Sequence, residues 1–177
     1  LADTRRYTRG AIALASTVAQ LAAAIALLVV AGGGVPGVWP DGVGVYLVGD
    51  WPAPFGIVLV VDRLAAVMLT LTATLGLATL IYSLARWDRA GVHFHSLFQF
   101  LLMGLNGAFL TGDLFNLFVF FEVLLAASYG LLLHGSGVAR VSAGLQYIAV
   151  NLVASFLLLI SIALIYGVTG TLNMADL

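Results

Sequence analysis

Five apolar stretches of the sequence are long enough to cross a membrane as helices. A helix rises about 1.5 Å per residue, so about twenty apolar residues cross the roughly 30 Å hydrocarbon core of a bilayer. Hydrophobic residues make up 62% of the chain and charged residues only 8%, whereas soluble domains carry about 25% charge. The sequence therefore predicts an all-α integral membrane protein, with transmembrane helices at about 11–31, 64–85, 94–111, 113–133 and 142–167.

One sizeable loop, residues 32–63, separates the first two predicted helices. It is rich in Gly and Pro, which favour turns, and its second part permits a β-hairpin across 43–61. The third and fourth predicted helices are joined only by residues 111–113, so they should form a tight antiparallel pair. We expect residues 1–177 to form a single transmembrane domain.

The start of the chain permits two interpretations. Arginines followed by an apolar run resemble a secretory signal peptide, but the run 11–31 is longer than the usual apolar part of such a signal, which favours a membrane helix. The chain begins with Leu1 rather than Met. We therefore expect it to be a fragment of a longer protein.

The arginines lie almost entirely on one side of the predicted membrane topology. With five spans, Arg63 stands alone on the side of the long loop. Basic residues concentrate on the cytoplasmic side of membrane proteins, so the first residues are predicted to lie in the cytoplasm. The other six arginines share that side: Arg5, Arg6, Arg9, Arg86, Arg89 and Arg140.

Glu122 is the only charged residue in the apolar run from Leu114 to Leu133. A charged side chain at the centre of a bilayer costs about 2.5–3.5 kcal/mol on insertion scales, so such residues usually have a function. The helical face of Glu122 offers only Tyr129 as a polar companion, and Ser128 is expected to point elsewhere. Glu122 is therefore a candidate for proton handling. The alternative is a structural Glu that is protonated or hydrogen-bonded.

The last predicted helix carries a polar stripe at four-residue spacing, formed by Tyr147, Asn151 and Ser155. Residues four apart lie on one face of a helix. The stripe is a candidate wall of a hydrated proton path that also includes Tyr129. It is equally typical of interhelical hydrogen bonds that hold helices together.

The three histidines fall at the ends of predicted helices on the arginine side. Histidine titrates near neutral pH, which makes His134 a candidate for proton uptake, although a favourable position at a helix end explains it as well. His93 and His95 lie on different helical faces because they are two residues apart, which argues against a metal site. The chain has no cysteine, which excludes disulfides and thiolate ligands. No cofactor is expected, and no glycine-rich phosphate loop or basic patch indicates nucleotide or nucleic-acid binding.

Other polar and small residues are expected to be structural. Asp113 should cap its helix, and Asp62 should either cap its helix or pair with Arg63. Gln99 and Asn106 are interpreted as helix-packing residues. Small residues at four-residue spacing predict close helix contacts, namely Gly104 with Ala108 and Ala126 with Gly130.

Three segments resemble one family of membrane proteins. They are NGAFLTGDLFNLFVFFEVLLAASYGLLLH (Asn106–His134), VVDRLAAVMLTL (Val60–Leu71) and YGVTGTLNMADL (Tyr166–Leu177). All three are similar to the D-type subunit of Mrp-type (also Mnh or Pha) multisubunit cation/proton antiporters. The tract FVFFEVLL is also similar to the antiporter-like subunits of complex I and of membrane-bound hydrogenases.

The resemblance implies a larger bundle of about fourteen helices with inverted repeats. It implies that Glu122 lies on the fifth helix and pairs with a Lys on the seventh, whereas this chain contains no Lys. The expected function is that of a secondary transporter subunit, not an enzyme, that exchanges protons for Na⁺ or another monovalent cation. Its expected partners are other antiporter subunits in a bacterial cytoplasmic membrane. The alternatives are a proton-pumping subunit of a complex I-like oxidoreductase or membrane-bound hydrogenase, and a scaffold subunit that does not transport.

Overall fold

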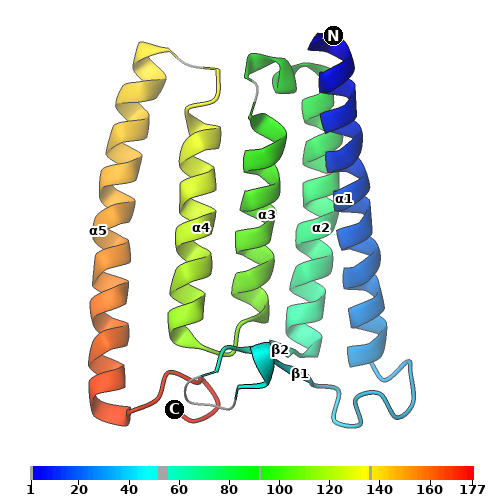
Figure 1. Cartoon of the computed structure of the whole chain (residues 1–177), viewed down its shortest axis with the longest axis vertical. Helices are drawn as coiled ribbons and strands as arrows, with labels where there is room; N and C mark the ends of the chain where they lie inside the picture. The colour runs from blue at the N-terminus through cyan, green and yellow to red at the C-terminus, as the bar shows by residue number, and fades with distance from the viewer. Residues whose placement is uncertain (1, 52–55, 92, 136) are drawn as a thin grey trace.

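The computed structural model describes residues 2–51, 56–91, 93–135 and 137–177, with the backbone alone for 2–5, 86, 89 and 90. Five long helices stand side by side and form a slab (Figure 1). One end of the slab holds the N-terminus and the α4–α5 connection, and we call it the arginine side. The other end holds the C-terminus and a β-hairpin, and we call it the hairpin side. The helices are α1 (Ala2–Ala31), α2 (Arg63–Arg86), α3 (Phe94–Leu110), α4 (Leu114–Leu132) and α5 (Val138–Thr169).

The prediction of five helices in a membrane protein is confirmed. Four of them are long and apolar enough to cross a membrane, whereas α3 has 17 residues and reaches about 25 Å. Two helices extend beyond the predicted spans: α1 begins at Ala2 rather than near 11, and α5 covers 138–169 rather than 142–167. Apolarity marks the part of a helix that lies in lipid, but backbone hydrogen bonding continues past it into polar sequence.

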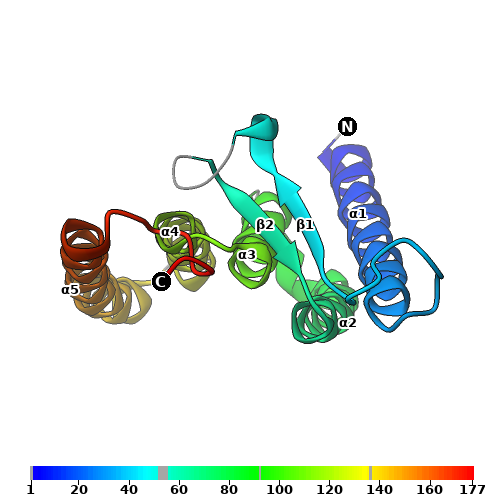
Figure 2. The same cartoon turned by 90° about the horizontal axis from the view of Figure 1, so that it is seen from below.

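The loop between α1 and α2 contains the predicted hairpin. Strands β1 (Gly44–Leu47) and β2 (Val58–Val61) pair antiparallel, with Val45 opposite Val60. Short 3₁₀ helices follow β1 (η1, Val48–Asp50) and α2 (η2, Trp87–Ala90). Seen from below, the hairpin crosses the ends of α2 and α3 (Figure 2).

The turn between α3 and α4 is held between the hairpin and the C-terminal segment. The Gly112 amide donates to the Val58 carbonyl (2.8 Å), and the Met174 amide donates to the Gly112 carbonyl (2.8 Å). The Leu114 amide donates to the Leu172 carbonyl (2.9 Å). These bonds tie three segments that are distant in sequence into one cover on the hairpin side.

Both predicted aspartate caps form. Asp62 Oδ1 accepts a hydrogen bond from the Ala65 amide (2.6 Å), and Asp113 Oδ1 accepts one from the Asn116 amide (2.8 Å). These bonds satisfy amides at the starts of α2 and α4 that have no partner within their helix. On the same hairpin side, α5 stops at Gly170, whose φ of 74° is a left-handed conformation that glycine adopts at low cost (Figure 1).

The helices α3 and α4 approach closely through glycine. A Cβ atom on Gly104 would lie 2.8 Å from the Leu124 backbone nitrogen, and one on Gly107 would lie 2.1 Å from the Phe120 ring. The predicted pairing of small residues was therefore only partly correct, because Gly107 joins Gly104 at this contact and Ala126 is exposed. Four-residue spacing determines which residues share a helical face, but it does not determine which neighbouring helix that face contacts.

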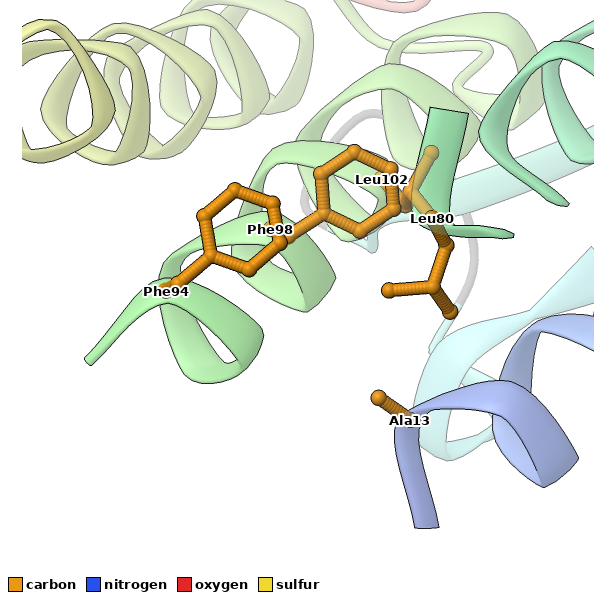
Figure 3. Packing of buried hydrophobic residues seen from close by; sticks show 5 residues of the cluster. All are labelled: Ala13, Leu80, Phe94, Phe98 and Leu102. Atoms are coloured by element: carbon orange, nitrogen blue, oxygen red, sulfur yellow. The ribbon is translucent and has the colours of Figure 1, made fainter. Parts of the chain in front are cut away.

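The main buried cluster lies where α1, α2 and α3 meet. Leu80 of α2 is fully buried between Ala13 of α1 and the α3 residues Phe98 and Leu102 (Figure 3). The Phe94 and Phe98 rings stack with centroids 5.8 Å apart. This cluster makes α1, α2 and α3 one packed unit, whereas α5 packs only at the edge of the slab.

Candidate functional site

Glu122 lies near the middle of α4, about 12 Å along the axis from Leu114 and about 15 Å from Leu132. Its side chain is half-buried. Its Oε1 atom is fully buried and has no hydrogen-bond partner among the described residues. A buried acceptor without a donor is unfavourable by about 1–3 kcal/mol, and by more when the group is charged. This oxygen therefore lacks the hydrogen-bond donor that buried acceptors usually have.

Tyr129 lies two turns along α4 on the same face, within electrostatic reach of Glu122. Its ring meets the Tyr147 ring of α5 edge to face, with centroids 5.7 Å apart. The Tyr147 hydroxyl lies 3.5 Å from Ser128 Oγ, and Ser128 donates to the Leu125 carbonyl (2.8 Å). Three hydroxyl groups thus gather between α4 and α5, on the arginine side of Glu122.

Ser128 belongs to this cluster although the spacing from Glu122 placed it on another face. Helical periodicity compares residues within one helix. It does not show whether a residue outside the face of Glu122 contacts a neighbouring helix. The contact with Tyr147 shows that Ser128 belongs to the cluster, and this contact is known only from the packing of α4 against α5.

Asn151 and Ser155 lie on α5 at the depth of Glu122. Tyr129 and Tyr147 are in contact, so they lie at the same depth. Glu122 lies seven residues from Tyr129 toward the hairpin side. Because α5 runs antiparallel to α4, the same depth on α5 is reached seven residues after Tyr147, at Ala154, which lies between Asn151 and Ser155. Both side chains are half-buried. The Asn151 amide donates to the Tyr147 carbonyl of its own helix (2.8 Å). The structure thus brings Tyr147 to Tyr129, and it leaves Asn151 bonded to its own backbone.

His134 follows the last turn of α4, about 18 Å along the axis from Glu122. It is buried, and its Nε2 lies 3.2 Å from the Trp87 carbonyl oxygen. Its ring packs against Phe94 (5.4 Å between centroids) and Trp87 (6.0 Å). Arg140 donates to the His134 carbonyl and lies over the Trp87 ring, 5.3 Å from its centroid. His134 therefore belongs to a cluster that joins four helix ends, apart from the hydroxyl groups near Glu122.

A second polar region, between α1 and α3, contains the residues that were interpreted as packing residues. The Gln99 amide donates to the Ala13 carbonyl (2.9 Å) and to Thr17 Oγ1 (3.1 Å). The Gln20 amide donates to Gln99 Oε1 (3.1 Å), and the Asn106 amide donates to Gln20 Oε1 (3.4 Å). Single-helix patterns do not predict this ladder, because its members come from two helices.

A buried ion pair at the arginine side is also missing from the sequence predictions. Arg6 Nε and Nη2 donate to the two carboxylate oxygens of Asp88, both at 2.8 Å. The Asp88 side chain is 1% exposed and lies in η2, 82 residues away in the sequence. His95 Nε2 lies 3.8 Å from Asp88 Oδ2. In the sequence, Arg6 indicates only the membrane topology, and no local pattern connects it to Asp88.

The histidines of this end contact aromatic rings and an ion pair. His95 meets Asp88 and Arg6, and His134 meets Trp87 and Phe94. In the part of the chain that the structure describes, no group of three or more His, Asp or Glu side chains is arranged to hold a metal ion.

Comparison with protein families and curated proteins gives consistent matches. The family described as "NADH:quinone oxidoreductase/Mrp antiporter, TM" matches residues 111–177, which include Glu122. A probable K⁺/H⁺ antiporter D-type subunit of Rhizobium meliloti is 66% identical over 172 residues, which are 97% of this chain and 32% of the relative. A Na⁺/H⁺ antiporter D-type subunit of Alkalihalophilus pseudofirmus is 45% identical over 142 residues, 79% of this chain and 29% of the relative.

Two solved complexes contain similar chains. A chain of the Mrp complex from Dietzia sp. is 41% identical with a TM-score of 0.84, and the match covers 99% of this chain and 32% of that one. A chain of the archaeal membrane-bound sulfane sulfur reductase is 30% identical with a TM-score of 0.79, covering 94% of this chain and 33% of that one. The chain thus spans about a third of the length of the relatives that it matches.

Proposed function

We propose that the chain forms part of a D-type subunit of an Mrp multisubunit cation/proton antiporter, which exchanges protons for Na⁺ or another monovalent cation, because it is similar to such subunits over most of its length. The relatives named Na⁺/H⁺ and K⁺/H⁺ antiporter subunits support the exchange of a monovalent cation. The subunit is a secondary transporter rather than an enzyme. Other subunits of the same complex are its partners, in keeping with the Mrp complex that contains a similar chain.

The observation that carries the proposal is the buried Oε1 of Glu122, which has no hydrogen-bond donor among the described residues. A carboxyl group in this position is stabilised when it holds a proton, and an ionised carboxylate there attracts a cation strongly because the interior screens charge poorly. Glu122 therefore holds a proton at mid-membrane and releases it when a partner cation approaches. The resemblance assigns that cation to a Lys of a helix outside this chain.

Hydroxyl groups on the arginine side of Glu122 provide the path to that end of the helices. Tyr129 and Tyr147 both donate and accept hydrogen bonds, so they can orient water molecules that carry protons. Asn151 and Ser155 line the same depth on α5. His134, the sequence candidate for proton uptake, lies farther toward the arginine side in a separate buried cluster, so the route does not depend on it.

The arginine distribution supports a cytoplasmic arginine side. Arg6, Arg9 and Arg140 lie at that end of the helices, and Arg63 begins α2 at the hairpin side. Cytoplasmic ends of membrane helices carry the excess of Arg. We place the chain in a bacterial cytoplasmic membrane, with the start of α1 in the cytoplasm and the hairpin outside.

A second candidate function follows from the likeness to the membrane-bound sulfane sulfur reductase, an archaeal respiratory complex. In that case the same Glu122 moves protons, but electron transfer in partner subunits drives the movement and no cation exchange is intrinsic to the subunit. Neighbouring genes separate the two candidates. Small antiporter subunits favour exchange, and iron–sulfur or quinone-binding subunits favour a redox-driven pump.

The test of Glu122 uses everted membrane vesicles that carry the full-length subunit with its complete operon. Added Na⁺ should dissipate the pH gradient in native vesicles. Glu122→Gln, which keeps the shape but removes the titratable group, should reduce the response to the background of vesicles without the complex. Glu122→Asp at matched expression is the control, because it keeps a carboxyl group and should keep part of the activity.

Three results would contradict the proposal. Unchanged exchange in Glu122→Gln would show that the carboxyl group is structural. Loss of complex assembly together with unchanged exchange per assembled complex would indicate a scaffold. No response of the native vesicles to Na⁺, K⁺ or Li⁺ would favour the redox-driven pump, and proton movement should then be measured with electron donors.

A further inference from the structure

Two hydroxyl groups meet across the α4–α5 contact, on the arginine side of Glu122. The Tyr147 hydroxyl of α5 lies 3.5 Å from Ser128 Oγ of α4. Ser128 also donates its hydrogen to the Leu125 carbonyl of its own helix (2.8 Å). A serine hydroxyl has one hydrogen to donate and two lone pairs that accept. Because the Leu125 carbonyl takes that hydrogen, Ser128 accepts in the contact with Tyr147 and the tyrosine hydroxyl donates.

The direction of this hydrogen bond matters for proton movement. A hydroxyl group passes a proton on when its oxygen accepts one from water on one side and its own hydrogen goes to an acceptor on the other. The hydrogen of Tyr147 is directed to Ser128, whose own hydrogen is directed to a backbone carbonyl. A backbone carbonyl has no hydrogen to pass on, so the hydrogen bonds that start at Tyr147 end there. In this arrangement Tyr147 does not relay a proton between Glu122 and the arginine side.

The contact between Tyr147 and Ser128 is weak enough to open. Its length of 3.5 Å exceeds the usual range of about 2.5–3.0 Å for hydrogen bonds between hydroxyl groups. The tyrosine ring is held separately, because it meets the Tyr129 ring edge to face with centroids 5.7 Å apart. Opening therefore requires only a rotation of the Tyr147 hydroxyl about its C–O bond. Tyr129, the next hydroxyl group, lies within electrostatic reach of Glu122.

The packing of α5 against α4 fixes the level of this contact. Gly144 lies three residues before Tyr147, and a Cβ atom on it would lie 2.7 Å from Leu133 Cδ2. The two helices therefore approach each other closely next to Tyr147. At the depth of Glu122, the Asn151 amide donates to its own helix instead (2.8 Å). The hydroxyl contact thus lies where α4 and α5 are close, between the arginine side and the depth of Glu122.

We propose that Ser128 is a positioning residue that holds the Tyr147 hydroxyl in a closed orientation, an inference that rests on the proposed function of Glu122. In the closed orientation Tyr147 donates to Ser128. In the open orientation the hydroxyl turns away from Ser128, its oxygen accepts a proton from water on one side of the contact, and its own hydrogen passes to water on the other. One proton enters and one leaves, so the hydroxyl group is restored. Ser128 thus regulates proton access to Glu122 from the arginine side.

The test measures proton leak in everted vesicles that carry the full-length subunit with its complete operon. An electron donor builds the pH gradient through respiration, respiration is stopped, and the decay of the gradient is followed without Na⁺, so the measurement needs no cation exchange. Ser128→Ala removes the acceptor of the Tyr147 hydrogen. It should raise the decay rate, corrected for vesicles without the complex, about threefold, the effect expected from the loss of one weak hydrogen bond. Ser128→Thr keeps a hydroxyl group at this position and should restore the native rate.

Ser161→Ala is the matched control for the loss of a serine hydroxyl. Ser161 also donates to a carbonyl of its own helix, that of Leu157 (2.8 Å), and it is exposed on α5. This variant should keep the native leak.

Tyr147→Phe tests the same contact from α5. It keeps the ring beside Tyr129 but removes the hydroxyl group, so Na⁺-driven proton movement should fall toward the background of vesicles without the complex. Combining Ser128→Ala with Glu122→Gln should remove the extra leak, because the opened route leads to Glu122.

Specific results would overturn the proposal. A native leak in Ser128→Ala would mean that Ser128 does not hold the tyrosine hydroxyl. An equal rise in Ser161→Ala would reduce the effect to loosened packing of α5. Extra leak that persists after Glu122→Gln is added would place the opened route elsewhere. The proposed function fails by a separate result, namely intact Na⁺ exchange in Glu122→Gln alone.

Discussion

The two halves of the slab differ in how many polar side chains bond across a helix interface. Between α1 and α3, Gln99, Gln20 and Asn106 donate hydrogen bonds across the helix interface. On α4 and α5, Ser128 and Asn151 donate to carbonyl groups of their own helices, and Glu122 has a buried oxygen without a partner in the described structure. Among the described residues, three amide side chains bond across the interface in the first half, whereas the second half has one cross-helix hydroxyl contact, between Ser128 and Tyr147.

Under the proposed function, the polar groups of the first half are structural and those of the second half are functional. Cross-helix hydrogen bonds in a membrane fix helices relative to one another. Side chains that bond their own backbone need no neighbouring helix, so they can face a path that fills with water. The first half can therefore act as a rigid frame for the second. Four substitutions test this division, beginning with the largest expected effect.

Arg6→Gln should destabilise the first half most. The substitution removes the two hydrogen bonds from a carboxylate that is 1% exposed, and loss of one member of a buried ion pair costs about 3–5 kcal/mol. The measurement is the free energy of unfolding of the full-length subunit in mixed micelles. Asp88→Asn should cost less, because the Arg6 side chain is 24% exposed and reaches water. Equal costs for the two variants would show that burial does not set the size of the effect.

Gly104→Ala should separate the two halves at their contact. The added Cβ would lie 2.8 Å from the backbone nitrogen of Leu124, so α3 and α4 must move apart, at a cost of about 1–3 kcal/mol. Gly167→Ala on α5 is the matched control, since no heavy atom lies within 4 Å of its added Cβ. That control should be neutral or stabilising by up to about 1 kcal/mol, because Ala favours helix more than Gly does. Equal effects in the same unfolding assay would contradict a close α3–α4 contact.

The helices, the hairpin and the two aspartate caps were predictable because each depends on local sequence. Apolar length gives the spans, glycine and proline give the loop, and Asp62 and Asp113 stand directly before apolar runs. Glu122 was predictable as a candidate for the same reason, since a lone carboxyl group in such a run is costly wherever the helix packs.

The contacts between helices were not predictable from one sequence. The Arg6–Asp88 pair joins residues 82 positions apart, and the α1–α3 ladder depends on how two helices are rotated about their axes. The same rotation brings Gly107 of α3 against Phe120 and leaves Ala126 of α4 exposed. Periodicity identifies a helical face, but only packing determines what the face meets.

Gln99→Leu should weaken the frame by less than the two variants above. Gln99 takes part in three hydrogen bonds, with the Ala13 carbonyl, Thr17 and Gln20. Cross-helix hydrogen bonds in membranes average about 0.6 kcal/mol, so the loss should be about 1–2 kcal/mol in the free energy of unfolding. Exchange activity per folded complex should stay unchanged. Lost exchange at unchanged stability would place Gln99 on a transport path and would contradict the division between the halves.

Asn151→Leu should have the smallest effect on stability and is the sharpest test of the second half. Its amide bonds the Tyr147 carbonyl of its own helix, which already takes part in the helix backbone, so stability should change by less than about 0.5 kcal/mol. Because Asn151 lies at the depth of Glu122, replacing it with an apolar side chain should dry the path and slow Na⁺-driven proton movement in vesicles. Ala154→Leu, on the same helix turn and exposed, is the control and should leave the rate unchanged. A stability loss as large as that of Gln99→Leu, with normal exchange, would make Asn151 a structural residue, and the two halves would then use polarity in the same way.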